Sequence, residues 1–347
     1  MGYSVDILNN IRMNASEDYQ NRIPEATRNN LAEIGQAFQT YDVLFNEFHS
    51  ALINKIGKTI IEQKMFENKL ARFKSGGITS PHDVEEIFQE MAKAEGPYDP
   101  EGKNPLGRRV GPGVKVVYHR EGRKDKYVIS LGDLDFVRVF RSEAQLDTFL
   151  KGKINAVYSG DNRDEWLLMK NLIGSYKAVD EEGNKTEECG YFPYEVTAMD
   201  QADSKEEFAK EFVKAVRKAV LDQSFLSDQY NVAGVERQAS AKDLVLFVHK
   251  DVLVEVDVER LATAFHQSNT DLKVVPTIIA MDDFGEISED TYAVMVEDDW
   301  FRVFDTLQKM EPIRNPDGLF TNYFYHHHQI ISASPFKNAV RFKKATV

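Results

Sequence analysis

The chain has 347 residues, a length that allows two or three domains. Apolar residues make up 42% of it and aromatic residues 11%, so a core can be buried and a disordered chain is excluded. A net charge of −13 argues against a fold held on nucleic acid by its own surface, because such binding depends on neutralised phosphates.

The first residues and the single cysteine indicate the compartment. Cys189 has no second cysteine to pair with, which excludes an internal disulfide framework and fits a reducing cytoplasm. The N-terminus lacks a basic and apolar export signal, and Asp6 stands where a myristoylation signal needs Ser or Thr. No run of about twenty apolar residues occurs, so a membrane span is not expected.

The N-terminal third of the chain predicts an arm followed by helices and a short β-favouring segment. Residues 1–30 are polar and rich in Asn, which predicts an arm ordered only against a neighbouring molecule. Apolar residues from Leu31 to Ile56 recur at helical spacing, and Thr59–Ile61 favours β structure. A second helix is expected over Asp83–Ala94, with one apolar face made of Val84, Ile87, Phe88 and Met91.

Two β-favouring runs, Val114–His119 and Lys126–Leu131, flank the charged segment Glu121–Asp125 and predict a hairpin. The hairpin is either a protruding arm or a surface element packed on its own domain. A basic cluster lies on and before it, and we predict that it pairs with acids of an adjacent subunit. The alternative is a solvated loop, because exposed ion pairs contribute little. The cluster consists of Arg108, Arg109, Arg120, Arg123, Lys124 and Lys126.

A long helix is predicted from Ser142 to Tyr176. Ser142 and Gln145 form a capping box, and apolar residues keep a helical period beyond it. A kink is possible at Gly160. An uninterrupted helix of this length would run about 50 Å and could serve as a spine.

The second half alternates strands and helices. A capping box at Ser204 and Glu207 opens an amphipathic helix, and a short helix is expected after Asp257. The predicted strands are Tyr191–Ala198, Leu244–Val248, Val274–Ala280 and Thr291–Val296.

The last fifty residues are rich in the large apolar and aromatic side chains that pack into a protein core. Asp299–Phe304 reads as a strand, followed by a polar helix-like segment and a turn at Arg314–Gly318. The long aromatic strand Asn322–Ile331 follows. The block contains no recognisable arrangement of catalytic groups.

Two short motifs have a simpler interpretation than ligand binding. Gly57-Lys58-Thr59 resembles the end of a P-loop, but Leu52 stands where that loop needs glycine. In the strand at 326–328, His326 and His328 face one way and His327 the other, so two imidazoles could share an ion. Zinc needs three or four ligands, and the surrounding aromatics favour a packed strand.

The acidic groups Asp282-Asp283 and Glu297–Asp299 could chelate a hard cation, although solvated turns explain them more simply. We therefore assign no catalytic, cofactor-binding or metal-binding residues. A soluble metal- or carboxylate-dependent enzyme remains the alternative class, because carboxylate sites leave no local sequence signature.

Short segments spread along the chain carry a family resemblance. They are Arg22–Thr27, Leu52–Gly57, Glu85–Phe88, Ile154–Tyr158, Trp300–Arg302, Lys309–Glu311, Arg314–Pro316 and Asn338–Val340. In this order they resemble the major head (major capsid) proteins of small short-tailed phages of the Picovirinae, or phi-29-like, type. The resemblance covers nearly the whole chain.

The resemblance implies the α+β Hong Kong 97-type capsid fold. The divisions expected from it are an N-terminal arm with the helix after it (1–58), an extended-loop region (59–140), a peripheral domain with a long spine helix (141–189), an axial domain (190–290) and a return to the peripheral domain (291–347). Bacillus-phage relatives continue into an immunoglobulin-like domain, whereas the sequence given ends at Val347.

The function implied is that of a major capsid protein. Copies would assemble with one another into hexamers and pentamers of a shell enclosing double-stranded DNA. A scaffolding protein and the head-tail connector, or portal, are the further partners expected, with no membrane and no cofactor. Assembly would take place in the host cytoplasm, and the mature protein would reside in the virion.

Overall fold

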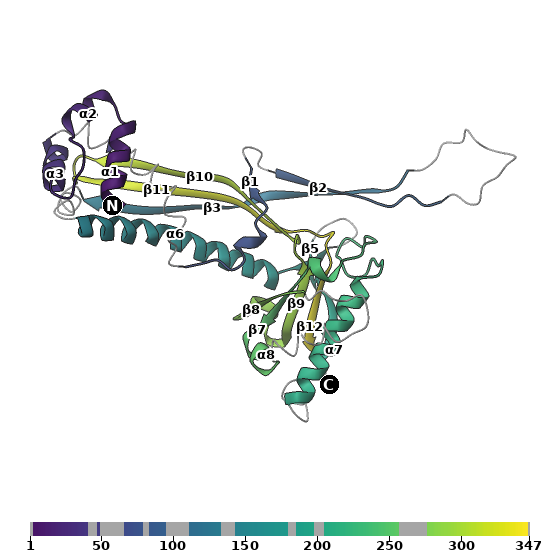
Figure 1. The fold of residues 1–347 in the computed structure, drawn as a ribbon. Helices are drawn as coiled ribbons and strands as arrows, with labels where there is room; N and C mark the ends of the chain where they lie inside the picture. The colour runs from purple at the N-terminus through teal and green to yellow at the C-terminus, as the bar shows by residue number, and fades with distance from the viewer. Residues whose placement is uncertain are drawn as a thin grey trace.

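The computed structural model describes residues 3–40, 47–48, 66–78, 83–94, 111–132, 143–179, 185–197, 205–256 and 276–345. These residues form an elongated α+β molecule (Figure 1). A long sheet lies along a long helix, with a helical cluster at one end and a two-stranded arm at the other. A second sheet with its own helices lies below the base of the arm. No helix in these residues is long and apolar enough to span a lipid bilayer.

The N-terminal cluster contains α1 (Tyr3–Asn14), α2 (Glu17–Arg22) and α3 (Leu31–Thr40). The prediction of an arm ordered only against a neighbour is wrong for residues 3–30. Few but regularly placed apolar side chains pack inside this chain, and α1 also contacts the long helix. The buried set includes Leu8, Ile11, Tyr19, Ile23, Leu31, Ile34, Phe38 and Phe48. Residues 41–46 and 49–65, including the predicted strand Thr59–Ile61 and the P-loop-like Gly57-Lys58-Thr59, lie outside the described residues.

Deletion of residues 1–30 is expected to destabilise this cluster, because the buried side chains Leu8, Ile11 and Tyr19 would be removed and Phe38 would lose its ring contact with Tyr19. Burial of apolar surface contributes roughly 25 cal/mol per Å². The measurement is the midpoint of thermal unfolding together with binding of a hydrophobic dye. Met13→Ala is the control, since Met13 is 76% exposed. An unchanged midpoint in the deletion variant would contradict the role of the cluster.

The long helix is α6, Glu143–Gly174, and it confirms the predicted spine. Its 32 residues span about 48 Å at the usual rise, and the helix continues through Gly160. Met169 and Ile173 on its buried face belong to a hydrophobic core shared with the second sheet.

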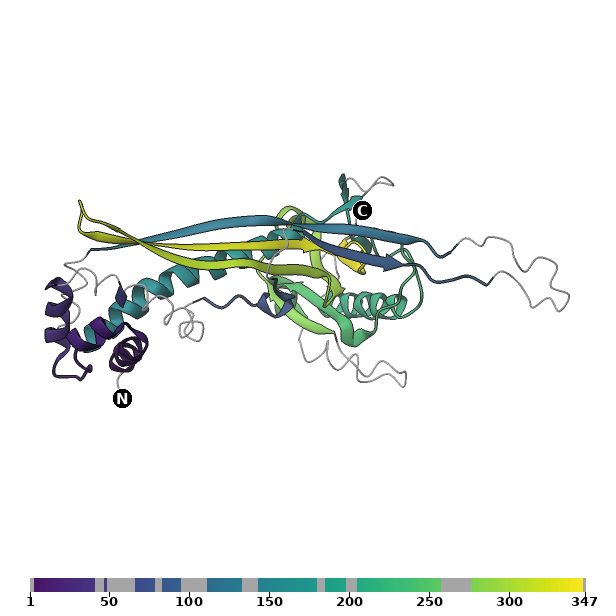
Figure 2. The same cartoon turned by 90° about the horizontal axis from the view of Figure 1, so that it is seen from above.

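The long sheet has the strand order β1-β10-β11-β3-β2. Its members are β1 (Gly76–Gly77), β2 (Asp83–Gln89), β3 (Val114–Gly132), β10 (Phe301–Asn315) and β11 (Phe320–Ala333). Strands β10 and β11 form an antiparallel hairpin, and the C-terminal part of β3 pairs with β11. The N-terminal part of β3 pairs with β2 and forms the arm (Figure 2).

The expected hairpin at Val114–Leu131 is wrong, because this segment is the single 19-residue strand β3. Residues Glu121–Asp125 look like a charged turn, yet they alternate across the pleat as strand residues do. Two different partner strands, β2 and β11, hold β3 extended on either side of position 121. Long-range pairing therefore overrides the local turn composition.

Two predicted helices are strands for the same reason. The expected helix Asp83–Ala94 is strand β2 followed by irregular chain, because Asp83–Gln89 pairs residue for residue with β3. The helix-like segment before Arg314 continues strand β10. Pro312 is tolerated there because β11 occupies one edge of β10, while β1 pairs on the other edge only at Phe304 and Asp305.

The second sheet has the order β6-β12-β9-β7-β8. Helices α7 (Lys205–Gln223) and α8 (Lys250–Glu255) contribute to the core on one face, and α6 contributes to the core that includes Phe247 and Val294. Strands β4 (Lys177–Val179) and β5 (Lys185–Cys189) form a small hairpin beside it. The five strands are β6 (Phe192–Val196), β7 (Leu244–His249), β8 (Thr277–Met281), β9 (Thr291–Glu297) and β12 (Ala339–Lys344).

The predicted strands of this half and the helix opened near Ser204 are confirmed, whereas the helix expected after Asp257 lies outside the described residues. Short 3-10 helices occur at Ala71–Phe73, Ala241–Asp243 and Gly285–Asp290. Segment 291–347 is divided between the sheets: β10 and β11 join the long sheet, while β9 and β12 join the second. The domain boundaries drawn from the resemblance stay predictions.

Candidate functional site

A buried polar network joins α6 to the long sheet. Asp161 and Glu165, one turn apart on α6, are 5% and 3% exposed. His327 of β11 places Nδ1 2.7 Å from Asp161 Oδ1 and Nε2 3.2 Å from Asp305 Oδ1. The histidine thus connects the helix to strand β10.

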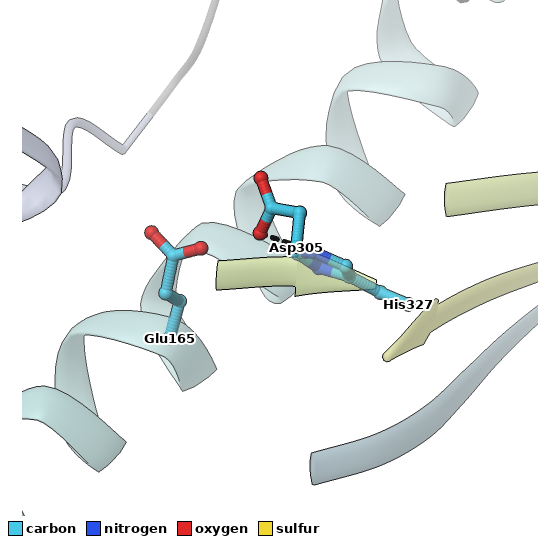
Figure 3. A group of neighbouring side chains, drawn as sticks. All are labelled: Glu165, Asp305 and His327. Atoms are coloured by element: carbon cyan, nitrogen blue, oxygen red, sulfur yellow. Dashed lines mark hydrogen bonds and ion pairs between the residues drawn. The ribbon is translucent and has the colours of Figure 1, made fainter. Parts of the chain in front are cut away.

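Glu165, Asp305 and His327 are close enough to suggest a metal centre, with one ligand atom of each within 4.8 Å of the others (Figure 3). Lys74 already supplies a cation: its Nζ lies 2.8 Å from Glu165 Oε2 and 2.9 Å from Asp305 Oδ1. Gln329 Nε2 donates to the same two oxygens at 2.6 Å each. The donor groups do not fit a resident metal, because an ammonium and an amide take the bonds an ion would need.

Lys74 is charged at neutral pH. Burial alone would lower its pKa, but the carboxylates of Glu165 and Asp305 raise it above the usual value. The network is therefore a set of ion pairs between α6, the sheet and the segment before β1.

Arg123 lies inside this network rather than on the surface expected of a subunit contact. It is 4% exposed. Its guanidinium donates to Asp125 at 2.6 Å, to Asp161 at 2.7 Å and to Gln329 at 2.5 Å. Its hydrogen-bonding capacity is used within its own chain.

The other described members of the predicted basic cluster lie on the surface, outside the buried network. Arg120 is 3.7 Å from Asp83, and Lys124 is 3.0 Å from Glu121. Lys126 lies over the ring of Phe324 at 5.8 Å. Arg108 and Arg109 lie outside the described residues. Contact of these basic residues with an adjacent subunit stays a prediction.

A groove of about 490 Å³ runs between β3 and α6 beside the network. Lys124 and Lys126 line one side, and Leu167 and Leu168 of α6 line the other. Leu168 is 37% exposed. Asp125 and Asp164 also line the groove, which therefore combines charges of both signs with apolar side chains.

The base of the arm is tied to the body through Glu86 of β2. Its carboxylate accepts from His119 at 2.9 Å, Arg302 at 2.6 Å and Ser334 at 2.9 Å. Burial would raise the pKa of Glu86, but these hydrogen bonds and the Arg302 charge lower it to about 2. The carboxylate is therefore ionised throughout the neutral range.

Ser332 Oγ lies 2.7 Å from His119 Nδ1, so Ser332, His119 and Glu86 follow the order of a catalytic triad. A triad carboxylate serves the histidine, whereas Glu86 is also bound by Arg302 and Ser334. The geometry therefore fits an anchor for the arm.

The two faces of the arm differ. On the inner face, Phe88 stacks on Phe336 with ring centroids 5.6 Å apart, and Lys115 donates to the Ala233 carbonyl at 2.6 Å. The outer face is apolar and open to solvent: Ile87 is 59% exposed, and Val114, Val116 and Tyr118 are 57%, 41% and 58% exposed. Ile87 and Val116 are directly paired across the strands.

The architecture and nearly the whole of the sequence both match known proteins. The family model of the Phi29-like phage major capsid protein matches residues 8–343. The chain belongs to this family. The capsid protein is therefore a building block of a phage head shell, as the sequence resemblance predicted.

Relatives of the capsid protein have the same role. The major capsid protein of Bacillus phage B103 is 34% identical over 342 residues, which cover 98% of this chain and 72% of the relative. That of Streptococcus phage Cp-1 is 27% identical, covering 96% of this chain and 93% of the relative. The relatives named are structural proteins of the virion.

Solved structures confirm the fold. A chain in the capsid structure of Staphylococcus phage Andhra superposes with a TM-score of 0.62 at 13% identity, covering 81% of this chain and 85% of that one. A chain in the asymmetric unit of the mature capsid of bacteriophage PhiM1 gives 0.52 at 9% identity, covering 82% and 89%. The α+β capsid fold expected from the resemblance is confirmed.

The sequence left most of the network unrecognised. Strand alternation correctly placed His327 on the face opposite His326 and His328. The signal for Asp161 and Glu165 was present as two acids inside the apolar stripe of a long helix. Glu297, interpreted as part of a solvated turn, is 4% exposed and bound by Arg237 at 2.5 Å.

Proposed function

We propose that the capsid protein assembles into hexamers and pentamers of a shell around packaged double-stranded DNA by laying its arm across a neighbouring copy. The exposed apolar outer face of the arm is the observation that carries this proposal. Such a face on a strand pair leading away from the molecule is costly for a free monomer (Figures 1 and 2).

The groove beside α6 supplies a matching surface on the neighbour. The outer face of the arm presents Ile87 and Val116 with the exposed acids Asp83 and Glu85, and Arg120 lies 3.7 Å from Asp83. The groove presents leucines together with Lys124 and Lys126, and Asp125 and Asp164 line it as well. Opposite charges on two apolar surfaces favour one docking orientation over others. An arm of one copy on the groove of the next is a head-to-tail contact, which closes rings by repetition.

A shell that encloses DNA needs further partners besides copies of the capsid protein. A net charge of −13 favours a lining that does not adhere to phosphates. A scaffolding protein would guide closure, and the head-tail connector would occupy one vertex. The protein would assemble in the host cytoplasm and remain in the virion.

The alternative of a soluble metal- or carboxylate-dependent enzyme is not favoured. The best-placed carboxylate and histidine cluster, around His327, is filled by Lys74 and Gln329. The triad-like series Ser332–His119–Glu86 ends at a carboxylate that is also bound by Arg302.

The double variant Ile87→Lys, Val116→Lys is expected to give folded subunits that no longer form shells, because two charges would have to be desolvated in the docked arm. Negative-stain microscopy and sedimentation of the variant, with scaffolding protein present, measure the particle yield. Val254→Lys is the control, since Val254 is 83% exposed and belongs to α8, which lies on the second sheet away from the arm (Figure 1). A normal particle yield from the double variant would refute docking through this face.

A further inference from the structure

The buried network between α6 and the long sheet has an uneven count of fixed charges. Asp161, Glu165 and Asp305 are its carboxylates, whereas Arg123 and Lys74 are its permanent cations. Uncompensated charge inside a protein is costly, so a third cation would stabilise the set. His327 is 1% exposed and lies among these groups.

Both ring nitrogens of His327 face a carboxylate oxygen. Nδ1 lies 2.7 Å from Asp161 Oδ1, and Nε2 lies 3.2 Å from Asp305 Oδ1. A neutral imidazole has one N–H, so one ring nitrogen would present its lone pair to a carboxylate. The imidazolium donates on both sides and leaves no such repulsion.

We propose that a proton held on His327 is the latch that fastens α6 to the long sheet. Protonated, the ring links Asp161 of the helix to Asp305 of β10. When the proton leaves, one of the two links is lost and the helix loosens from the sheet. Since this sheet carries the β3 half of the arm, the latch sets how firmly arm and helix are held in one unit.

The groups facing His327 come from every element around it. Strand β3 supplies Arg123, which opposes a charged ring, but Arg123 is itself compensated by Asp125 and Asp161. Helix α6 adds Glu165, and the segment before β1 adds Lys74, which lie 2.8 Å apart and compensate each other.

Two neutral groups complete the surroundings of the ring. The side-chain amide nitrogen of Gln308 on β10 lies 3.1 Å from Nε2, and the amide must turn over to present its oxygen to a protonated ring. The ring of Tyr325 packs 6.0 Å away, and its hydroxyl lies 3.3 Å from Asp161 Oδ2. The net charge of the groups around His327 is therefore negative.

The direction of the pH dependence follows from the same contacts. Burial alone would lower the pKa of His327, but the hydrogen bonds to Asp161 and Asp305 raise it above its usual value. A group with a raised folded pKa stabilises fully below its unfolded pKa, about 6.5 for histidine. That stabilisation is lost as pH rises through the folded pKa. The latch is therefore closed below about pH 6.5 and opens as the pH rises through the raised folded pKa.

The test is nitrogen-15 NMR of the ring nitrogens in unassembled, histidine-labelled subunits, compared between wild type, His327→Gln and His326→Gln. His326 is the matched control on the opposite face of β11. We expect one imidazolium signal that persists above the ordinary histidine pKa of about 6.5 and is absent only from His327→Gln. Finding that this signal titrates below about pH 6.5, or belongs to another histidine, would overturn the proposal.

A second measurement keeps the test decisive if His327→Gln folds poorly. Asp161→Asn removes the negative charge from one of the two acceptors, and the pKa of His327 is expected to fall while Asp305 still holds Nε2. In urea unfolding, the wild-type and His326→Gln midpoints should fall together as pH rises above about 6.5, whereas the Asp161→Asn midpoint should change less. Equal pH dependence in all three proteins would contradict the latch.

Discussion

Glu86→Ala is expected to release the base of the arm and to reduce particle yield sharply. The substitution leaves His119 and Arg302 without their shared carboxylate in a buried position. Breaking a buried ion pair from one side typically costs roughly 3 kcal/mol or more. The arm would remain paired as β2 and β3, but its angle to the body would no longer be fixed. Chemical unfolding of the subunit and electron microscopy of assembly reactions measure the two effects.

Glu85→Ala is the matched control for stability. Glu85 is the preceding residue on the outer face of β2 and bonds only to the exposed Tyr118 hydroxyl among the contacts described. Its removal is expected to change stability by no more than about 0.5 kcal/mol. If both variants unfolded at the same denaturant concentration, Glu86 would not be an anchor.

The contribution of Glu86 also has a defined pH window. Its folded pKa is depressed to about 2, whereas an unperturbed glutamate titrates near 4.3. The stabilisation is therefore present above the unfolded pKa and is lost as pH falls through the folded pKa. The stability difference between wild type and Glu86→Ala should shrink between about pH 5 and pH 2.

Arg123→Ala is expected to weaken the attachment of α6 to the sheet by about 3–5 kcal/mol, because Asp161 loses the guanidinium that pairs with it while staying buried. Gln329 and Tyr127 would lose donors as well. The measurement is the urea midpoint of the isolated subunit, where no neighbouring copy is present. A large loss there would show that Arg123 acts within its own chain.

Lys124→Ala serves as the comparison, because Lys124 is adjacent but has a side chain 61% exposed. We expect its effect on subunit stability to stay below about 1 kcal/mol. Its effect should instead appear in assembly, since it lines the groove proposed for the neighbouring arm. A stability loss equal to that of Arg123→Ala would contradict this division of roles.

The sequence by itself identified the elements whose signals are local and repeated. The stripe from Leu146 onward and the capping box at Ser142 predicted α6, and the run Leu244–Val248 predicted β7. Such elements bury a face whose period is written along the segment, so neighbours in the sequence are enough to reveal them. The scattered family motifs, ending with Asn338–Val340, supplied the fold and the role.

Tertiary structure decided the conformation wherever the partners are distant in sequence. Strand β3 passes straight through Glu121–Asp125 because β2 and β11 pair with it on either side of position 121. Arg123 is buried because Asp161 and Gln329, 38 and 206 residues away, take up its charge and its donors. No local pattern encodes such pairings, since pairing and ion compensation depend on which segments the fold brings together.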